Sequence, residues 1–284
     1  MSHKTEIESL VYLLDDPDPK VHRAVRERLY TLGEQIVPLL DQQKEKAEEE
    51  EDRSRIAEVI HTITYGSVEE DFLNVLEGGM PNLKQLEEAV LLLCRFENPT
   101  MRVLDYKRQL DQFADTIYAE IRYEPDENKQ MHLLLDYIFN DLGFSGATIN
   151  YYHPDNAYLN KVIDRRRGLP ISLAFIVLFL ARRLELPFKG INMPIHFMLM
   201  FKGKKEGIFI DPFDHGKTVS YNQCHYFLKQ NGIEPKSFHF SQVSPPEMLA
   251  RCMRNLISSY KKTGDKAKME QLQELLYTLE MLSA

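Results

Sequence analysis

Three polar residues in the second half of the sequence have the types and order of a nucleophile, a general base and an orienting acid. Ser172 lies in the first turn of a predicted helix, His196 begins a predicted strand, and Asp211 ends the next one. An antiparallel hairpin would place His196 and Asp211 side by side, so the carboxylate would hold the imidazole through Nδ1 and leave Nε2 as a base. Backbone N–H groups at the helix start would stabilise a developing oxyanion. The pattern predicts acyl-transfer or hydrolytic chemistry.

Each of these residues also has a structural explanation, and the alternatives stay open. Ser172 is a natural capping hydroxyl, a His at a strand end is commonly hydrogen-bonded and half-buried, and an Asp-Pro pair at a strand exit favours a turn. A weaker alternative is a metal site formed by His153, His196, Asp211 and His215. No short His-x-x-His spacing supports it, so we expect neither a metal nor a cofactor.

The elements that would position these residues form a helix-rich α+β arrangement. Pro170 suits a first helical position, and the helix that it opens is apolar almost all round from Ile171 to Leu180, so it is predicted to be the buried central element. Runs typical of strands follow at Phe188–Met193, Ile195–Phe201 and Gly207–Ile210. Lys202–Glu206 is predicted to be the hairpin loop between the last two. Earlier short helices are expected at Met131–Leu142 and Tyr158–Arg166, and the last two at Pro246–Lys262 and Lys266–Leu282.

Residues 1–78 are predicted to form a stack of short helices. The stretch Asp15–Pro19 breaks a first apolar stripe and supplies an N-cap for a second, which Gly33 ends. A third apolar helix follows from about Gln35, and this arrangement resembles one HEAT-type helical repeat. Because an array needs about three repeats to bury its faces, we interpret the region as a helical cap or interaction platform. The charge run Lys44–Asp52 is interpreted as a solvated helix face.

Composition excludes several classes of protein. The net charge is −8, but residues 151–240 are basic, with 13 Lys and Arg against 7 Asp and Glu. This segment either binds an anionic substrate or partner or is attracted to the acidic front half. An isoelectric point near 5.7 disfavours nucleic-acid binding. The longest apolar run, Leu173–Ala181, is too short for a membrane span, and the first ten residues do not resemble a secretion signal, so we expect a soluble, cytoplasmic protein.

Several segments carry a family resemblance. They are NAYLN at 156–160, VIDRRRGLPISL at 162–173, MPIHF at 193–197 and FIDPF at 209–213. Together they resemble the transglutaminase-like core of the bacterial SirB-type family, over roughly residues 80–284. LARCMRNL at 249–256 resembles the family's final segment, which leads into tetratricopeptide helices in longer members. The resemblance implies a papain-like core at 79–245 with its preceding helices, followed by a helical hairpin at 246–284.

The resemblance also implies which residues would react. Transglutaminases and their peptidase relatives use a Cys at the start of the central helix, with a His and an Asp on consecutive strands. His196 and Asp211 match the His and the Asp, but Pro170 stands where the Cys would be, and Ser172 lies two residues later. None of the three cysteines, Cys94, Cys224 and Cys252, can replace it by register. Relatives tend to carry Gly where this chain has Ile195, which would narrow the approach to His196.

The sequence therefore predicts two alternative functions. The first is a transglutaminase-like protein without the thiol chemistry, which recognises a protein or an anionic small molecule. Its candidate binding residues are Asn160, Arg165, Arg166 and Arg167, beside the expected cleft. Arg guanidinium groups suit carboxylate and phosphate, although three successive arginines on a helix cannot all face one way. The alternative is a hydrolase or acyltransferase that acts on peptide or amide bonds through Ser172, His196 and Asp211. Neither nucleic acid nor membrane is expected as a partner.

Overall fold

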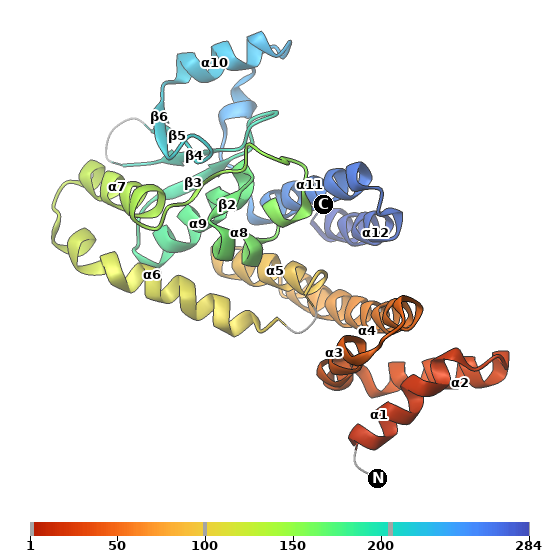
Figure 1. Ribbon diagram of the computed structural model, residues 1–284. Coiled ribbons are helices and arrows are strands. Elements are labelled where there is room, and N and C mark those ends of the chain that lie inside the picture. Colours follow the sequence, from red (N-terminus) through yellow and green to blue (C-terminus); the bar gives the residue numbers. More distant parts are fainter. Residues whose placement is uncertain (1–2, 99–100, 204–206, 284) are drawn as a thin grey trace. The chain divides into compact units, whose positions relative to one another are not determined.

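The computed structural model describes residues 3–98, 101–203 and 207–283, and its helices and strands are drawn in Figure 1. The chain divides into two compact units. One consists of Met1–Asn74 with Leu92–Arg102, and the other of Val75–Leu91 with Val103–Ala284. Many helices accompany one small antiparallel sheet, which confirms the predicted α+β class. The predicted boundaries near residues 78 and 245 stay predictions.

The first unit is built from amphipathic helices that bury aliphatic side chains. Its main helices are α1 (His3–Tyr12), α2 (Pro19–Leu32), α3 (Val37–Lys46) and the larger part of α4 (Glu50–Glu77). Asp18 caps α2 by accepting a hydrogen bond from the Lys20 backbone, and Gly33, with φ +65°, ends it. The predicted break and stop are therefore confirmed. The charge run is divided between the end of α3 and the start of α4.

Helix α9 (Pro170–Arg183) lies at the centre of the second unit. Every residue from Pro170 to Ala181 is buried, as the apolar sequence predicts. Helices α6 (Val103–Tyr123), α8 (Leu159–Arg165) and α11 (Pro245–Thr263) pack on it together with strands β3 and β4. The last helix, α12 (Lys266–Ser283), pairs with α11, which confirms the predicted hairpin of helices. None of the described helices is long and apolar enough to cross a membrane.

The sheet is an antiparallel meander in which every strand pairs with its neighbour in sequence. Its order is β3 (Phe188–Ile191), β4 (Met198–Phe201), β5 (Ile208–Asp211) and β6 (Lys217–Val219), followed by α10 (Tyr221–Gln230). The first three strands were expected, but β4 begins three residues later than predicted. Pro194 lacks an N–H and Ile195 has φ +68°, so the chain bends there and His196 precedes the strand. Of the predicted hairpin loop, residues 204–206 lie outside the described residues.

Two short elements bring further segments to the start of α9. Strands β1 (Ser145–Gly146) and β2 (Arg167–Gly168) form a parallel pair. Before β1, helix α7 (Glu127–Asp136) continues into one π-helical turn over Tyr137–Asp141, and Gly143, with φ +73°, ends the segment where the sequence predicts a stop. Arg166 has φ +56° and ends α8, so Arg167 enters β2 instead of extending the helix.

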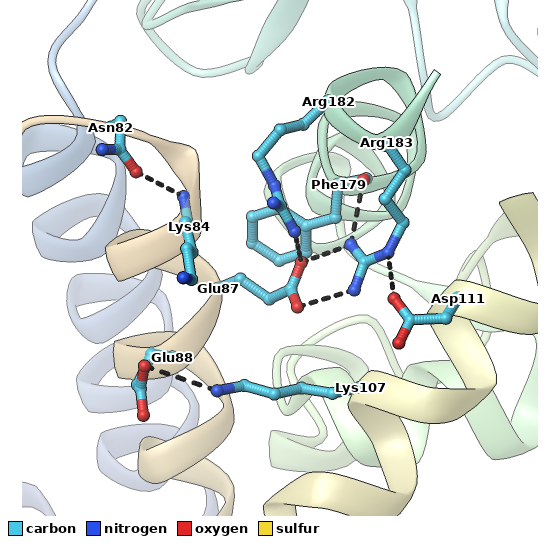
Figure 2. A network of polar contacts seen from close by, with 9 residues as sticks. All are labelled: Asn82, Lys84, Glu87, Glu88, Lys107, Asp111, Phe179, Arg182 and Arg183. Atoms are coloured by element: carbon cyan, nitrogen blue, oxygen red, sulfur yellow. Dashed lines mark hydrogen bonds and ion pairs between the residues drawn. The ribbon is translucent and has the colours of Figure 1, made fainter. Parts of the chain in front are cut away.

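A buried ion network joins α5 (Leu83–Arg95), α6 and α9 inside the second unit (Figure 2). The Glu87 side chain is 3% exposed, and its carboxylate accepts hydrogen bonds from two arginines at the end of α9. Arg182 Nη2 donates over 3.0 Å, and Arg183 donates through Nη1 over 2.6 Å and Nη2 over 2.9 Å. Arg183 Nε also donates to Asp111 on α6, over 2.7 Å. The charges are thus mutually compensated, as burial requires.

Candidate functional site

His196 and Asp211 form a close hydrogen-bonded pair beside the sheet. His196 Nε2 and Asp211 Oδ1 are 2.7 Å apart, and both side chains are about one-fifth exposed. The same Oδ1 accepts hydrogen bonds from the backbone N–H groups of Phe213 and Asp214, over 2.8 Å and 3.2 Å. Burial acts to raise the pKa of Asp211, but the hydrogen bond from His196 and the two N–H groups bring it below its usual value. An ionised Asp211 therefore orients the imidazole.

The structure confirms the predicted juxtaposition and corrects one detail of it. The nitrogen that faces Asp211 is Nε2, whereas the sequence-based prediction assigned Nδ1 to this contact. The error has a physical cause: strand pairing brings the two residues together, but His196 lies in the bend before β4, and that bend sets the ring orientation. Nδ1 makes no hydrogen bond to any described residue, so it is the nitrogen left for proton transfer or for a ligand.

Aromatic rings surround the His196 imidazole. Phe213, two residues after Asp211, lies edge-on at 6.1 Å between ring centroids, and Phe227 of α10 lies at 5.8 Å. Phe213 also contacts Tyr151 and packs on Gly146 of β1, where a Cβ atom would be only 2.8 Å from the ring. Gly146 is therefore required for this close approach. Phe213 links the His196–Asp211 pair to the segment beside the start of α9.

Ser172 is not brought to His196. Its side chain is completely buried, and its Oγ donates a hydrogen bond to the Ala157 carbonyl over 3.0 Å. Cys252 Sγ contacts the same carbonyl at 3.9 Å. No hydrogen bond joins Ser172 to His196 among the described residues. The hydroxyl therefore fixes the segment before α8 to the start of α9. It does not cap the helix, which was the structural alternative, because α9 begins after Leu169 without a side-chain cap.

The three cysteines all lie inside the described structure, away from its surface. Cys94, Cys224 and Cys252 are all buried, and none of them is in a disulfide. Cys224 belongs to α10, the helix that also carries Phe227, and the Asp211 charge acts on it. Burial, and then the negative charge of Asp211, raise the pKa of Cys224 to about 11. A thiol with this pKa is almost entirely protonated near neutral pH and reacts slowly.

The three successive arginines have three different environments. Arg166 is half-buried, with its guanidinium over the rings of Phe113 and Phe144 at 4.8 Å and 4.6 Å from their centroids. Burial lowers the pKa of Arg166 from its usual value. This cation therefore packs in the interior instead of facing a partner. Arg165 and Arg167 are exposed on either side of it.

Arg165 and Arg167 line the same surface depression, which we name the arginine hollow. It has a volume of about 460 Å³ and is formed by residues 146–150 with His153, Asp155, Asn156, Arg165 and Arg167. Arg165 Nη1 donates to Asn156 over 3.3 Å and lies 3.7 Å from Asp155. Arg167 Nη1 donates to the carbonyls of Gly143 and Arg166. Both arginines keep donors with no partner among the described residues, as anion binding requires.

The remaining predicted residues are placed away from a binding surface or apart from each other. Asn160 is 1% exposed, so it cannot contact a partner from its position in α8, and its Oδ1 is buried with no hydrogen-bond partner in the described structure. His153 lies in the arginine hollow, whereas His215 belongs to a different depression beside α7. The described residues contain no cluster of three or more His, Cys, Asp or Glu that could hold a metal ion. The alternative metal site is therefore wrong for these residues.

Sequence reasoning missed two features around His196. Ile195 is 53% exposed and has φ +68°, which is rare for a β-branched residue. The unusual Pro-Ile-His order was a usable signal, because Pro194 restricts the chain before it. Phe213, which packs against the His196 ring, follows the Asp-Pro pair directly, but sequence alone could not indicate which ring it would contact.

With this geometry described, comparison with known proteins identifies the family. Residues 104–254, more than half of the chain, match a family model described as the transglutaminase-like superfamily. The chain belongs to this superfamily. The matched region runs from the start of α6 to the middle of α11 and includes Ser172, His196 and Asp211. The predicted transglutaminase-like core is thereby confirmed.

Curated relatives match over parts of their length. A UPF0162 protein of Xylella fastidiosa (strain 9a5c) is 31% identical over 185 residues, which are 63% of this chain and 66% of that protein. A UPF0162 protein of Vibrio cholerae is 28% identical over 62% of this chain and 66% of its own length. F-box only protein 21 of Homo sapiens is 28% identical over 68% of this chain and 31% of its own length. The chain thus spans slightly less than two thirds of these bacterial relatives. No solved structure matches.

Proposed function

We propose that this chain is a non-catalytic binding module of the superfamily, of the SirB type, which recognises an acidic protein segment or an anionic small molecule in the arginine hollow. The proposal rests on the residues that the structure has at the start of helix α9. Pro170 stands at the first helical position, and the nearest hydroxyl, that of Ser172, is buried and donates to Ala157. A nucleophile must be accessible and close to its base, so the burial of Ser172 and its hydrogen bond to Ala157 support a non-catalytic role.

The arginine hollow supports recognition of an anion. The exposed guanidinium groups of Arg165 and Arg167, the sequence neighbours of Arg166, both line this depression. Among the lining residues of the described structure, Asp155 is the one carboxylate. Arg suits carboxylate and phosphate groups because it presents several donors in a planar fork. In this proposal the HEAT-like first unit supplies further contacts to a protein partner, and the protein acts in the cytoplasm.

A binding titration tests the proposal directly. The probe is a fluorescein-labelled hexaglutamate peptide, followed by fluorescence anisotropy with the full chain at low and at physiological salt. We expect saturable binding that weakens with salt and falls at least tenfold in the Arg165→Glu/Arg167→Glu variant. Arg108→Glu, at an exposed arginine of α6, is the matched control and should change the affinity less than twofold. Equal affinity of the double variant and the wild type would contradict the proposal.

The His196–Asp211 pair is the specific observation that favours a second function. An imidazole held by a carboxylate at 2.7 Å is the arrangement of a general base, so the alternative is a hydrolase or acyltransferase acting on peptide or amide bonds. It requires the start of α9 to rearrange and bring Ser172 Oγ to Nδ1. Aminocoumarin amides and nitrophenyl esters are suitable substrates for this test.

The two functions differ in their response to substitution. A binding module retains peptide affinity in Ser172→Ala and in His196→Ala, and it shows no turnover of the amides or esters. An enzyme shows turnover that both substitutions abolish while the far-UV circular dichroism spectrum stays unchanged. Turnover with this dependence would replace the binding proposal.

A further inference from the structure

A second depression lies at the other end of α9, and none of the residues considered above for catalysis or anion binding belongs to it. We name it the lysine pocket. It has a volume of about 450 Å³ and lies where the start of α5, the end of α9, strand β3 and the start of α11 meet. Since α9 has 14 residues and rises about 1.5 Å per residue, the two ends of the helix are roughly 20 Å apart. The lysine pocket is thus separate from the arginine hollow.

Three cations from three different elements converge on the lysine pocket. Lys84 comes from α5, Arg182 from α9 and Lys189 from β3. No Asp or Glu is among the lining residues of the described structure. Neither lysine side chain forms an ion pair with a described residue. Arg182 is paired with Glu87, so the uncompensated charges are those of Lys84 and Lys189. Two like charges that face one pocket without a counter-charge repel each other, and a bound anion would relieve this repulsion.

Arg182 supplies donors that the ion network does not use. Its Nη2 donates to Glu87, as Figure 2 shows, but its Nε–H is buried and has no hydrogen-bond partner, and Nη1 has none among the described residues. Nε is closed off from solvent, whereas Nη1 is not, so Nη1 is the Arg182 donor that a ligand oxygen in the pocket can reach. In the described structure Glu87 accepts from Arg182 only through Nη2, and its other two hydrogen bonds come from Arg183.

Most of the remaining wall of the lysine pocket is apolar, and Asn82 and Gln242 are its neutral polar residues. Leu178, Phe188, Val243, Pro245 and Met248 contribute hydrocarbon surface, and Met248 packs directly on Gly190 of β3. A cavity of this size that combines apolar walls with a few convergent polar groups is typical of sites for small molecules. The apolar wall favours a ligand with a hydrophobic body over a simple inorganic anion.

From these features we propose that the lysine pocket binds a small amphipathic anion. The ligand would have one anionic head, a carboxylate, sulfonate or phosphate, and an apolar body the size of two or three rings or a short acyl chain. Lys84 and Lys189 attract the head, Arg182 donates hydrogen bonds to it, and the side chains of β3 and α11 cover the body. This inference does not depend on the function proposed for the arginine hollow.

The test uses paired probes that differ in charge. Anilinonaphthalene sulfonate carries a sulfonate on an apolar ring system, and N-phenylnaphthylamine has the same rings without the charge. We expect the full chain to bind the sulfonate at one site with a rise in fluorescence, and to bind the neutral amine at least tenfold more weakly. Sodium decanoate should displace the sulfonate, whereas decanol should not.

Substitutions then assign the site. The variant Lys84→Glu/Lys189→Glu should weaken sulfonate binding at least tenfold, and Lys84→Gln/Lys189→Gln, which adds no repulsion, at least threefold. Lys229→Glu, at an exposed lysine of α10, is the matched control and should change it less than twofold. Arg182 is left unchanged because it belongs to the ion network. Circular dichroism verifies that each variant is folded.

Three results would overturn the inference. They are the absence of sulfonate binding by the folded wild type, equal binding of the two probes, and unchanged affinity in either folded double variant. Peptide binding in the arginine hollow is measured with the same proteins. Because Lys84 and Lys189 do not line that hollow, failure of one proposal leaves the other testable.

Discussion

Replacing Glu87 by Gln should destabilise the second unit, because it removes the buried carboxylate that pairs with Arg182 in the described structure. Glutamine has nearly the same shape but no charge, and its amide group would point N–H bonds at guanidinium donors. Removing one partner of a buried ion pair typically costs 3–5 kcal/mol. Asp111 still neutralises Arg183 over 2.7 Å, so we expect a loss at the lower end of this range. The free energy of unfolding should fall by about 3 kcal/mol.

The neighbouring Glu88 offers a matched control on the same helix. Its side chain is 45% exposed and forms one ion pair, with Lys107 at 3.4 Å (Figure 2). A surface pair of this kind contributes roughly 0–1 kcal/mol. Glu87→Gln and Glu88→Gln therefore change the same functional group, one in a buried network and the other in solvent.

Thermal unfolding followed by circular dichroism measures the difference. At about 2–4 °C per kcal/mol for a unit of this size, Glu87→Gln should lower Tm by about 6–12 °C, and Glu88→Gln by at most about 4 °C. Urea denaturation should give the same order of stability. If the two variants have Tm values within 2 °C of each other, the Glu87 carboxylate does not compensate the arginines as the structure indicates.

Three further predictions concern the surroundings of His196. The pKa of Asp211 is lower in the folded protein than its usual 3.8, so its contribution to stability is present above about pH 4 and is lost as the pH falls through the folded value. In urea denaturation, acidification from about pH 5 to 3 should therefore destabilise the wild type more than the Asp211→Asn variant. The Cys224 thiol, with a pKa of about 11, should react with iodoacetamide at pH 7.5 on the order of 100-fold more slowly than a free cysteine; a comparable rate, read by mass spectrometry of its peptide, would contradict the assigned burial. Ile195→Asn should raise the free energy of unfolding by about 1 kcal/mol, because Asn tolerates the positive φ that strains Ile; a lower Tm would show that the exposed Ile195 side chain contributes packing that outweighs the strain.

The sequence was most informative where one physical signal dominated. The almost continuous apolar run of α9 could only be buried, and Asp18 with Pro19 could hardly do anything other than start a helix. The closeness of His196 and Asp211 followed from strand order alone. These predictions depend on periodicity and on antiparallel pairing, both of which are encoded locally.

Features that depend on tertiary contacts were beyond the sequence. The burial of Asn160 and the packing of Arg166 between Phe113 and Phe144 require knowledge of which helices meet. The role of Glu87 had a weak signal, since it lies one helical turn from the apolar Leu83 and Leu91 and thus on the inner face of α5. Its arginine partners lie more than 90 residues later, and no local pattern connects them.

The ion network also bears on the order of events in folding. Each strand of the sheet pairs with the strand beside it in sequence, so the meander closes short loops and can form early at low entropic cost. The contact between Glu87 and Arg183 closes a loop of 96 residues, and its charges lose their hydration only when α5, α6 and α9 have come together. We therefore expect this network to form after the rate-limiting step. Interactions made after that step slow unfolding and leave the rate of folding almost unchanged. The network therefore increases the kinetic stability of the second unit.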